Sequence, residues 1–453
     1  MPPQTQNRRD LLQSYRLMTQ RTALALIAGE PDSPNQPLRR RNMATIFGIL
    51  VGVIACVLFG VLGMLSPGAV TGLTKAGTLV IDKDTATPYV PCQAAGEQKL
   101  CPALNYASAL LALGTQGVNR VDVTQKTLAN YKIGPAIGIA GLPQDLPTSA
   151  DLIKGPWSVC IDSSSVSTLI GGASVTGGTK LTTATAELVK SLGQTWVLYM
   201  GARYQIADAT MAELWPQASP QTVSPAWLNT IPQNPNGFTP PAISGWGQSV
   251  QGPAGQAKAG QVYSVSSAGL GTQYFVLEPD QKLHNVTAVQ ATLLEHEPGA
   301  PAQATLAAGQ ATNLGTPVPS EGLPASKPTI PQFTSPVCVS LGAGLSRTIT
   351  TGGTMPANPT PTGNGSPNTV DKVWLPQGHG ALIGVTGGPD LPPVKSWFLL
   401  DGATRYGLAG SAVAGDLGYE LAKVQTVLPA SLVDVLPQGP ALDPNRARQP
   451  SSG

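Results

Sequence analysis

Short patterns that mark catalytic or metal-binding sites are missing from this sequence. It contains no GxxxxGK(S/T) phosphate-binding loop, no HExxH metal motif and no GxSxG nucleophile elbow. It also lacks a CxxC pair, and its three histidines, His284, His296 and His379, are scattered along the chain. We therefore expect no catalytic, cofactor-binding or metal-binding residues. His296 lies between Glu295 and Glu297, and we interpret this group as the solvated end of a short helix.

Charged and aromatic residues are also scarce. They make up 11% and 5% of the 453 residues, and the net charge is only +2. This balance gives no electrostatic reason to expect nucleic-acid binding. Glycine and proline are abundant instead, with 51 and 43 residues. Because both residue types interrupt long helices, we expect short strands, turns and brief helices outside any membrane segment.

An uncharged apolar run separates a basic N-terminal segment from the rest of the chain. Residues 1–42 carry seven arginines and three acidic residues, a net charge of +4, so the remainder has a net charge of −2. Residues 43–65 have no charged side chain, and a helix of this length can cross a hydrocarbon core of roughly 30 Å. A cleaved signal peptide fits poorly, because its apolar core has only about 7–15 residues. A buried core helix also fits poorly, because the run has no polar face.

The arginine triplet at 39–41 directly precedes the apolar run and predicts its orientation. Positively charged residues beside a membrane helix favour the cytoplasmic side. We therefore expect a single-pass protein of the cell membrane, with a cytoplasmic basic segment (1–42), a transmembrane helix (43–65) and an extracytoplasmic region (66–453).

Of the five cysteines, Cys56 lies inside the apolar run and four lie outside it. In an oxidising compartment, four cysteines allow three pairings, and the sequence alone does not choose among them. We favour Cys92 with Cys101 as a local loop and Cys160 with Cys338 as a long-range link.

A pattern of Trp, a short apolar run, Gly and Arg-Tyr occurs at residues 195–206 and 396–408, with looser copies at 273–286 and 78–90. Each copy predicts a β-hairpin, because Gly or a Pro-Asp pair supplies the turn. A Val-x4-Leu spacing follows each hairpin and predicts a strand that leads into a short helix, which Pro or Gly ends. The pairs are Val123 and Leu128, Val223 and Leu228, Val289 and Leu294, and Val427 and Leu432.

These features predict an α+β fold: an elongated extracytoplasmic domain with a disulfide-linked, β-rich central part and four small hairpin-plus-short-helix repeats. The tips of the hairpins, at 201–204 and 402–406, are expected to contribute to binding. The expected boundaries are repeat 1 at 66–148, the first half of the central domain at 149–190, repeat 2 at 191–245, repeat 3 at 262–302, a Pro/Gly/Ala-rich linker at 303–335, the second half of the central domain at 336–395, repeat 4 at 396–442 and a disordered tail at 443–453.

Three runs in the extracytoplasmic region are similar to a known family. LCPALNYASALLALG (100–114), YKIGPAIGIAGLPQDLP (131–147) and WSVC (157–160) resemble the EccB membrane component of type VII (ESX) secretion systems of actinobacteria. The basic N-terminal segment is similar to that family as well. The resemblance implies a central domain flanked by four repeats, with a disulfide that matches Cys160 and Cys338. It also implies an FtsK-like ATPase and a multi-spanning channel subunit as partners, and oligomeric assembly.

Two classes of function follow. The first is a structural component of a secretion membrane complex, a homo-oligomer within it, whose repeats bind partner proteins or the cell wall. The alternative is a membrane-tethered hydrolase, either an ATPase or a cell-wall hydrolase. Members of the family have been labelled ATPases, but the 42-residue inner segment is too short to build a nucleotide site. A wall hydrolase needs paired carboxylates or a metal centre, and the sequence has no pattern for either. We expect no enzyme activity.

Overall fold

The computed structural model describes residues 8–28, 37–65, 72–114, 118–267, 269, 271–363, 365–386, 394 and 396–451. The chain divides into two units, Met1–Gly72 and Leu73–Gly453. We describe each unit by itself.

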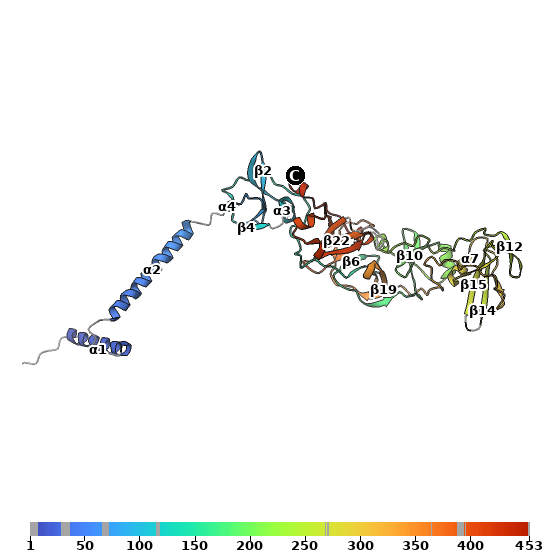
Figure 1. Ribbon diagram of the computed structural model, residues 1–453, viewed down its shortest axis with the longest axis horizontal. Helices are drawn as coiled ribbons and strands as arrows, with labels where there is room; N and C mark the ends of the chain where they lie inside the picture. Colours follow the sequence, from blue (N-terminus) through green and yellow to red (C-terminus); the bar gives the residue numbers. More distant parts are fainter. Residues whose placement is uncertain are drawn as a thin grey trace, which may run out of the picture. The chain divides into compact units, whose positions relative to one another are not determined.

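The described residues of the first unit form two helices, α1 (Arg8–Ala28) and α2 (Pro37–Leu65). Figure 1 shows α2 as one continuous helix. It contains Met43–Val61, a 19-residue stretch that is long and apolar enough to span a membrane. This stretch lies within the predicted span at 43–65. We did not predict α1, although leucine, glutamine, arginine and alanine, which favour helices, dominate its sequence.

The part of the second unit that the structure describes includes four small sheets with one topology. In each, three antiparallel strands are followed by a helical segment and a fourth strand that pairs in parallel with the first. The first sheet has β1 (Thr78–Asp82), β2 (Pro88–Ala94), β3 (Glu97–Pro102), α3 (Tyr106–Leu113) and β4 (Asn119–Val123). The second has β8 (Glu187–Ser191), β9 (Gln194–Tyr199), β10 (Ala202–Ile206), α5 (Asp208–Leu214) and β11 (Gln221–Thr222).

The third and fourth sheets lie later in the chain. The third has β14 (Val262–Ser267), β15 (Gly271–Leu277), β16 (Leu283–Val286), α7 (Ala288–Glu295) and β17 (Ala304–Leu306). The fourth has β22 (Gly380–Thr386), β23 (Ser396–Asp401), β24 (Thr404–Gly407), α8 (Val413–Asp416), α9 (Leu421–Val424) and β25 (Gln425–Pro429). A separate hairpin, β12 (Ser249–Gly252) and β13 (Gly255–Lys258), precedes the third sheet in the chain.

The predicted repeat of one hairpin and one short helix was too small. We placed β8 in the first half of the central domain and β22 in the second half, but each is the first strand of a repeat sheet. Both strands are buried almost throughout, so they lack the alternating pattern of a half-exposed strand. The predicted linker at 303–335 was also wrong, because it contains β17 and the buried side chain of Leu323.

Short helices follow the fourth strand in three of the sheets: α4 (Gln125–Leu128), α6 (Pro225–Asn229) and α10 (Ala430–Val433). The third repeat differs. Val289 and Leu294 lie in α7, which precedes the fourth strand and corresponds to α3 and α5. The Val-x4-Leu spacing therefore treated a helix before the fourth strand as equivalent to the helices after it, because both kinds bury apolar residues at a similar interval.

A seven-stranded central sheet joins two distant parts of the chain. Its order is β20-β21-β6-β5-β18-β19-β7. The strands are β5 (Trp157–Ile161), β6 (Ser167–Gly171), β7 (Thr176–Lys180), β18 (Val337–Leu341), β19 (Arg347–Thr354), β20 (Thr360–Pro361) and β21 (Lys372–Trp374). A short 3-10 turn, η1 (Ala343–Leu345), connects β18 to β19.

Buried apolar side chains connect the sheets through shared cores. One core joins the first and fourth sheets, and another joins the central sheet to the second and fourth. A third core joins the second sheet to α7 of the third repeat. Figure 1 shows the result for β6 and β22, which lie side by side although about 210 positions separate them in the sequence. The second unit is thus held together by packing between repeats.

The C-terminal segment 443–453 was predicted to be disordered, and for the described residues this was wrong. Helix α11 (Pro444–Ala447) forms there, and Ala447 is fully buried in the core of the first and fourth sheets. Arg448 Nε donates to the main-chain oxygen of Ala112 at 2.9 Å. The Asp443-Pro444 pair supplies an N-cap and a proline at the first helical position, a signal that the sequence carried.

Candidate functional site

The three histidines do not converge on one site. The side chain of His284 lies near Asp280, that of His296 lies 3.6 Å from Glu213, and His379 Nδ1 lies 2.9 Å from the main-chain oxygen of Gln377. Within the described ranges, no three His, Cys, Asp or Glu side chains are grouped so that they could hold a metal ion. Each histidine thus has its own local partner, and the described residues bring no three of these groups together.

The four cysteines of the second unit lie in two bonded pairs. Cys92 on β2 is joined to Cys101 on β3, with a Cα–Cα distance of 5.8 Å. Cys160 on β5 and Cys338 on β18 lie directly opposite each other and are fully buried. They are 178 residues apart in the sequence, so on the chain-entropy model this link stabilises the fold by about 5 kcal/mol.

Each repeat ends on the same local contact, which sequence analysis did not predict. After its fourth strand the chain returns and forms a single parallel bridge to the third strand. The bridges are Leu100 to Ile133, Arg203 to Gln233, Leu283 to Leu314 and Arg405 to Gln438. The next residue pairs along these bridges are Cys101 with Gly134, Tyr204 with Asn234, His284 with Gly315 and Tyr406 with Gly439. At the three glycines, an added Cβ would overlap the facing side chain.

Arg203 and Arg405, from the two clear copies of the sequence pattern, occupy equivalent positions. The guanidinium of Arg203 lies 5.0 Å from the centre of the Trp196 ring, and that of Arg405 lies 5.0 Å from the Phe398 ring. Arg405 also forms a 2.7 Å ion pair with Asp434. Burial lowers the pKa of Arg203. These arginines stabilise their own repeats through cation–π contacts, so little of either guanidinium is available to a binding partner.

The hairpin tip at 201–204 is not the free surface that we expected. A Cβ at Gly201 would overlap the main-chain carbonyl of Arg347 in the central sheet. Tyr204 is buried, and its hydroxyl donates to the main-chain oxygen of Gly322 at 2.8 Å. At the other tip, a Cβ on Gly402 would meet no atom within 4 Å. The tip at 201–204 therefore contacts other parts of the second unit, whereas Gly402 at the other tip is open.

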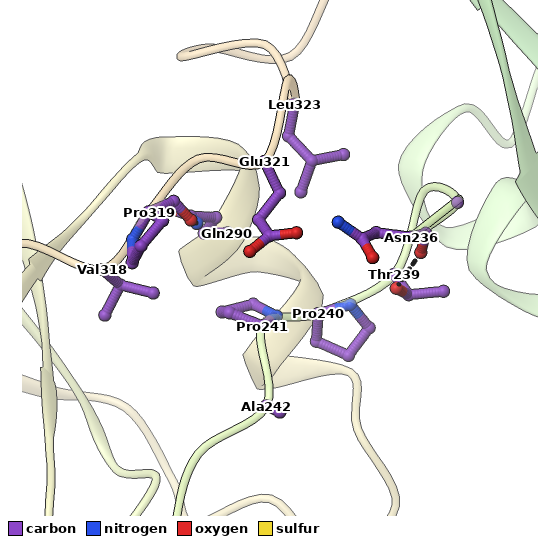
Figure 2. A pocket seen from close by; sticks show the side chains of 11 residues that line it. Asn236, Thr239, Pro240, Pro241, Ala242, Gln290, Val318, Pro319, Glu321 and Leu323 are labelled. Carbon is purple, nitrogen blue, oxygen red and sulfur yellow. Dashed lines mark hydrogen bonds between the residues drawn. The ribbon is translucent and has the colours of Figure 1, made fainter. Parts of the chain in front are cut away.

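A hollow of about 360 Å³ lies between segment 236–242 of the second repeat and segment 318–323 of the third. Pro240, Pro241 and Leu323 supply apolar walls. Figure 2 shows the Glu321 carboxylate in the middle of the hollow, between Asn236 on one side and Gln290 and Pro319 on the other. The exposed Glu321 belongs to none of the ion pairs found among the described residues.

A second hollow, of about 570 Å³, shares Pro240 and Pro241 with the first. Its walls include Phe238, Trp246 and Leu294, with the exposed acid Glu297 and Pro298 also in the lining. The Pro240–Pro241 segment thus borders two hollows, and each has one carboxylate. Neither hollow contains the paired acids and oriented nucleophile that hydrolysis requires.

The buried carboxylate of Glu187 lies outside both hollows. Glu187, on β8, is 1% exposed, and its Oε2 atom has no hydrogen-bond partner. Burial raises the pKa of Glu187 to about 7. Since no charged neighbour contributes to this change, the cause is loss of hydration rather than a catalytic partner.

Comparisons with known proteins agree with the resemblance seen in the sequence. The family described as type VII secretion system ESX-1, transport TM domain B, matches residues 4–452. ESX-2 secretion system ATPase EccB2 of Mycobacterium tuberculosis is 30% identical over 269 residues, which cover 55% of this chain and 52% of the relative. ESX-3 secretion system ATPase EccB3 of the same species is 27% identical over 442 residues, which cover 87% and 79%. The chain thus spans about half the length of the EccB2 relative.

Solved structures show the same fold. One chain of an intact ESX-5 inner membrane complex has a TM-score of 0.65 and 21% identity, and the match covers 100% of this chain and 97% of that one. A chain of the EccB3 dimer from the ESX-3 core complex has a TM-score of 0.63 and 21% identity, with coverage of 82% and 99%. Since the family match runs along almost the whole sequence, this chain belongs to the EccB family of type VII secretion system components.

Proposed function

We propose that this protein is a structural subunit of a type VII (ESX) secretion membrane complex. The observation that carries the proposal is the family match over residues 4–452, which includes the apolar helix and all four repeats. Relatives with this fold are part of an ESX-5 inner membrane complex and of an ESX-3 core complex. A chain of several packed repeats suits this role, because extended repeat surfaces can contact more than one partner.

The same proposal covers position and partners. Helix α2 crosses the cell membrane, segment 1–42 lies in the cytoplasm, and the second unit lies outside. The partners are an FtsK-like ATPase, a multi-spanning channel subunit and further copies of this chain, and the cell wall is an additional contact. The arginine triplet at 39–41 supports this orientation, and the EccB3 dimer and the ESX-5 complex support assembly.

We also propose that the chain acts by binding and has no catalytic activity, although relatives carry the name ATPase. Support comes from the separation of the three histidines, since the described residues contain no group of three His, Cys, Asp or Glu side chains that could hold a metal ion. No arrangement in the described part of the chain favours the alternative of a membrane-tethered hydrolase.

Purification of the full-length protein in mild detergent tests this function. Mass spectrometry of what co-purifies should find a large ATPase and a multi-spanning membrane subunit. The same preparation, freed of that ATPase, should show no saturable ATP hydrolysis. A protein that purifies alone, or hydrolysis that a point mutation in this chain abolishes, would contradict the proposal.

A further inference from the structure

We propose that the hollow around Pro240, Pro241 and Glu321 binds a lysine or arginine side chain of a partner polypeptide. The inference rests on the proposed role in assembly and adds the chemistry of one contact. It starts from the carboxylate of Glu321, which is exposed in the middle of the hollow and belongs to no ion pair among the described residues (Figure 2).

The walls of the hollow match the two parts of a basic side chain. Lysine and arginine combine an aliphatic stem with a charged end, and the stem packs on apolar surface while the end seeks a charge partner. Pro240, Pro241 and Leu323 offer the apolar surface, and Glu321 and Asn236 offer oxygen acceptors. A carboxylate that meets a guanidinium or ammonium group forms a charge-assisted hydrogen bond, stronger than a neutral one.

The loop that carries Glu321 is held in place from both repeats. Asn234 Nδ2 donates to the main-chain oxygen of Glu321 at 2.9 Å, and the Tyr204 hydroxyl donates to that of the following residue at 2.8 Å. From the third repeat, Gln290 Nε2 donates to the main-chain oxygen of Pro319 at 2.7 Å. Because these bonds already fix the loop, a partner would lose little entropy in ordering it.

Other occupants fit this chemistry less well. A phosphate or nucleic acid would be repelled by the Glu321 carboxylate. A calcium ion takes six to eight oxygen ligands, and one carboxylate with one amide supplies too few. The second hollow adds Trp246 and Glu297 across the same pair of prolines. An extended polypeptide can place a basic side chain in the first hollow and another side chain beside Trp246, so a polypeptide is the occupant that uses both.

Methyl NMR of the full-length protein in nanodiscs tests the inference. The methyl groups of Val318 and Leu323, both in the lining, serve as reporters. The probes are three acetylated and amidated pentapeptides, Gly-Leu-X-Leu-Gly, in which X is Arg, Lys or Glu. We expect saturable shifts with the Arg and Lys peptides and none with the Glu peptide. Glu321→Gln should weaken binding of the Arg and Lys peptides by up to about fivefold, because an ion pair to an exposed carboxylate is partly screened by water.

Glu420→Gln is the matched control, because Glu420 is an exposed acid of the fourth repeat. It should bind the Arg peptide as the wild type does. Equal shifts with all three peptides, no shifts with any, or unchanged binding in Glu321→Gln with an otherwise native spectrum would overturn the inference. Co-purification of the secretion subunits tests the wider function separately: if they are recovered while the peptides do not bind, only the site fails.

Discussion

Replacing the buried Glu187 with glutamine is expected to raise the stability of the second unit relative to wild type as the pH rises from 5 to 8. Its side chain is 1% exposed, its Oε2 atom has no partner, and burial raises its pKa from 4.5 to about 7. Because the folded pKa is above the unfolded one, the folded state binds more protons between these values. Glu187 therefore does not reduce the free energy of unfolding below about pH 4.5. It reduces that free energy increasingly as the pH rises, and the reduction is complete above about pH 7.

The size of this effect follows from the difference in pKa. At about 1.4 kcal/mol per unit, the ionised Glu187 costs on the order of 3 kcal/mol above pH 7. Glutamine has nearly the same shape but no charge, so it avoids this cost. Its amide brings donors that need partners in the same buried place, which costs about 1–3 kcal/mol. We therefore expect Glu187→Gln to gain stability relative to wild type as the pH rises from 5 to 8, by up to about 3 kcal/mol.

Thermal unfolding of the full-length protein, followed by tryptophan fluorescence at pH 5 and pH 8, measures this change. Other groups titrate over the same range, so the informative quantity is the difference between variant and wild type at each pH. Glu297→Gln is the control, because Glu297 is exposed and its variant should follow the wild type at both values. If the difference between Glu187→Gln and wild type is the same at pH 5 and pH 8, burial of the carboxylate is not what limits stability.

Three further predictions concern the repeats and the central sheet. Both ring nitrogens of His284 face oxygen acceptors. Burial lowers the pKa of His284, but the bonds to these oxygens raise it more. The protonated imidazole therefore stabilises the fold below about pH 6.5, and this stabilisation is lost as the pH rises through the pKa of the folded state. His284→Phe should therefore lose less stability than wild type between pH 6 and pH 9, and an equal loss in thermal unfolding would contradict this. Gly439→Ala should destabilise by about 1–3 kcal/mol, since its Cβ would overlap the aromatic ring that closes the fourth repeat, whereas Gly410→Ala, in open space, should not. Peptide mapping without reduction should recover Cys160 joined to Cys338, and a peptide that joins either one to another cysteine would refute the split central sheet.

Local features of the sequence were sufficient to predict some elements. The apolar run predicted a membrane helix because length and absence of charge are local properties, and α2 contains such a segment. The Trp and Arg-Tyr pattern predicted hairpins at β9–β10 and β23–β24, where a two-residue turn connects the strands. In both cases the signal lies within about a dozen consecutive residues, so one sequence can show it.

The remaining features depend on contacts between distant residues. Strands β8 and β22 complete their sheets by pairing in parallel with β11 and β25, and the sequence gives no register for such pairs. The bridges that close the repeats connect residues about 30 positions apart through a single pair each. A glycine followed shortly by a proline, as at 134–135 and 439–440, marks these closures, but the same dipeptides are common in ordinary turns.

The hollow around Glu321 could not be predicted from the sequence, because it too depends on contacts between distant residues. Its two sides, 236–242 and 318–323, lie about 80 residues apart in segments rich in proline. Proline-rich segments have no helical or strand periodicity, so we interpreted the second of them as a linker. In the structure, hydrogen bonds from Tyr204, Asn234 and Gln290 hold that segment against both repeats. Composition predicted the absence of regular structure at 318–323 correctly, but it could not predict the hydrogen bonds that hold this segment against both repeats.

The closing contact shows how four repeats of one fold can serve different purposes. The same position on the third strand holds a disulfide-bonded cysteine in the first repeat, tyrosine in the second and fourth, and histidine in the third. Each of these side chains packs where the returning chain must approach closely, so its chemistry can vary while the backbone stays the same. The hollows that Pro240 and Pro241 line lie on connecting segments outside the four sheets. A sequence pattern that marks the hairpins therefore predicts part of the fold but gives no information on these hollows.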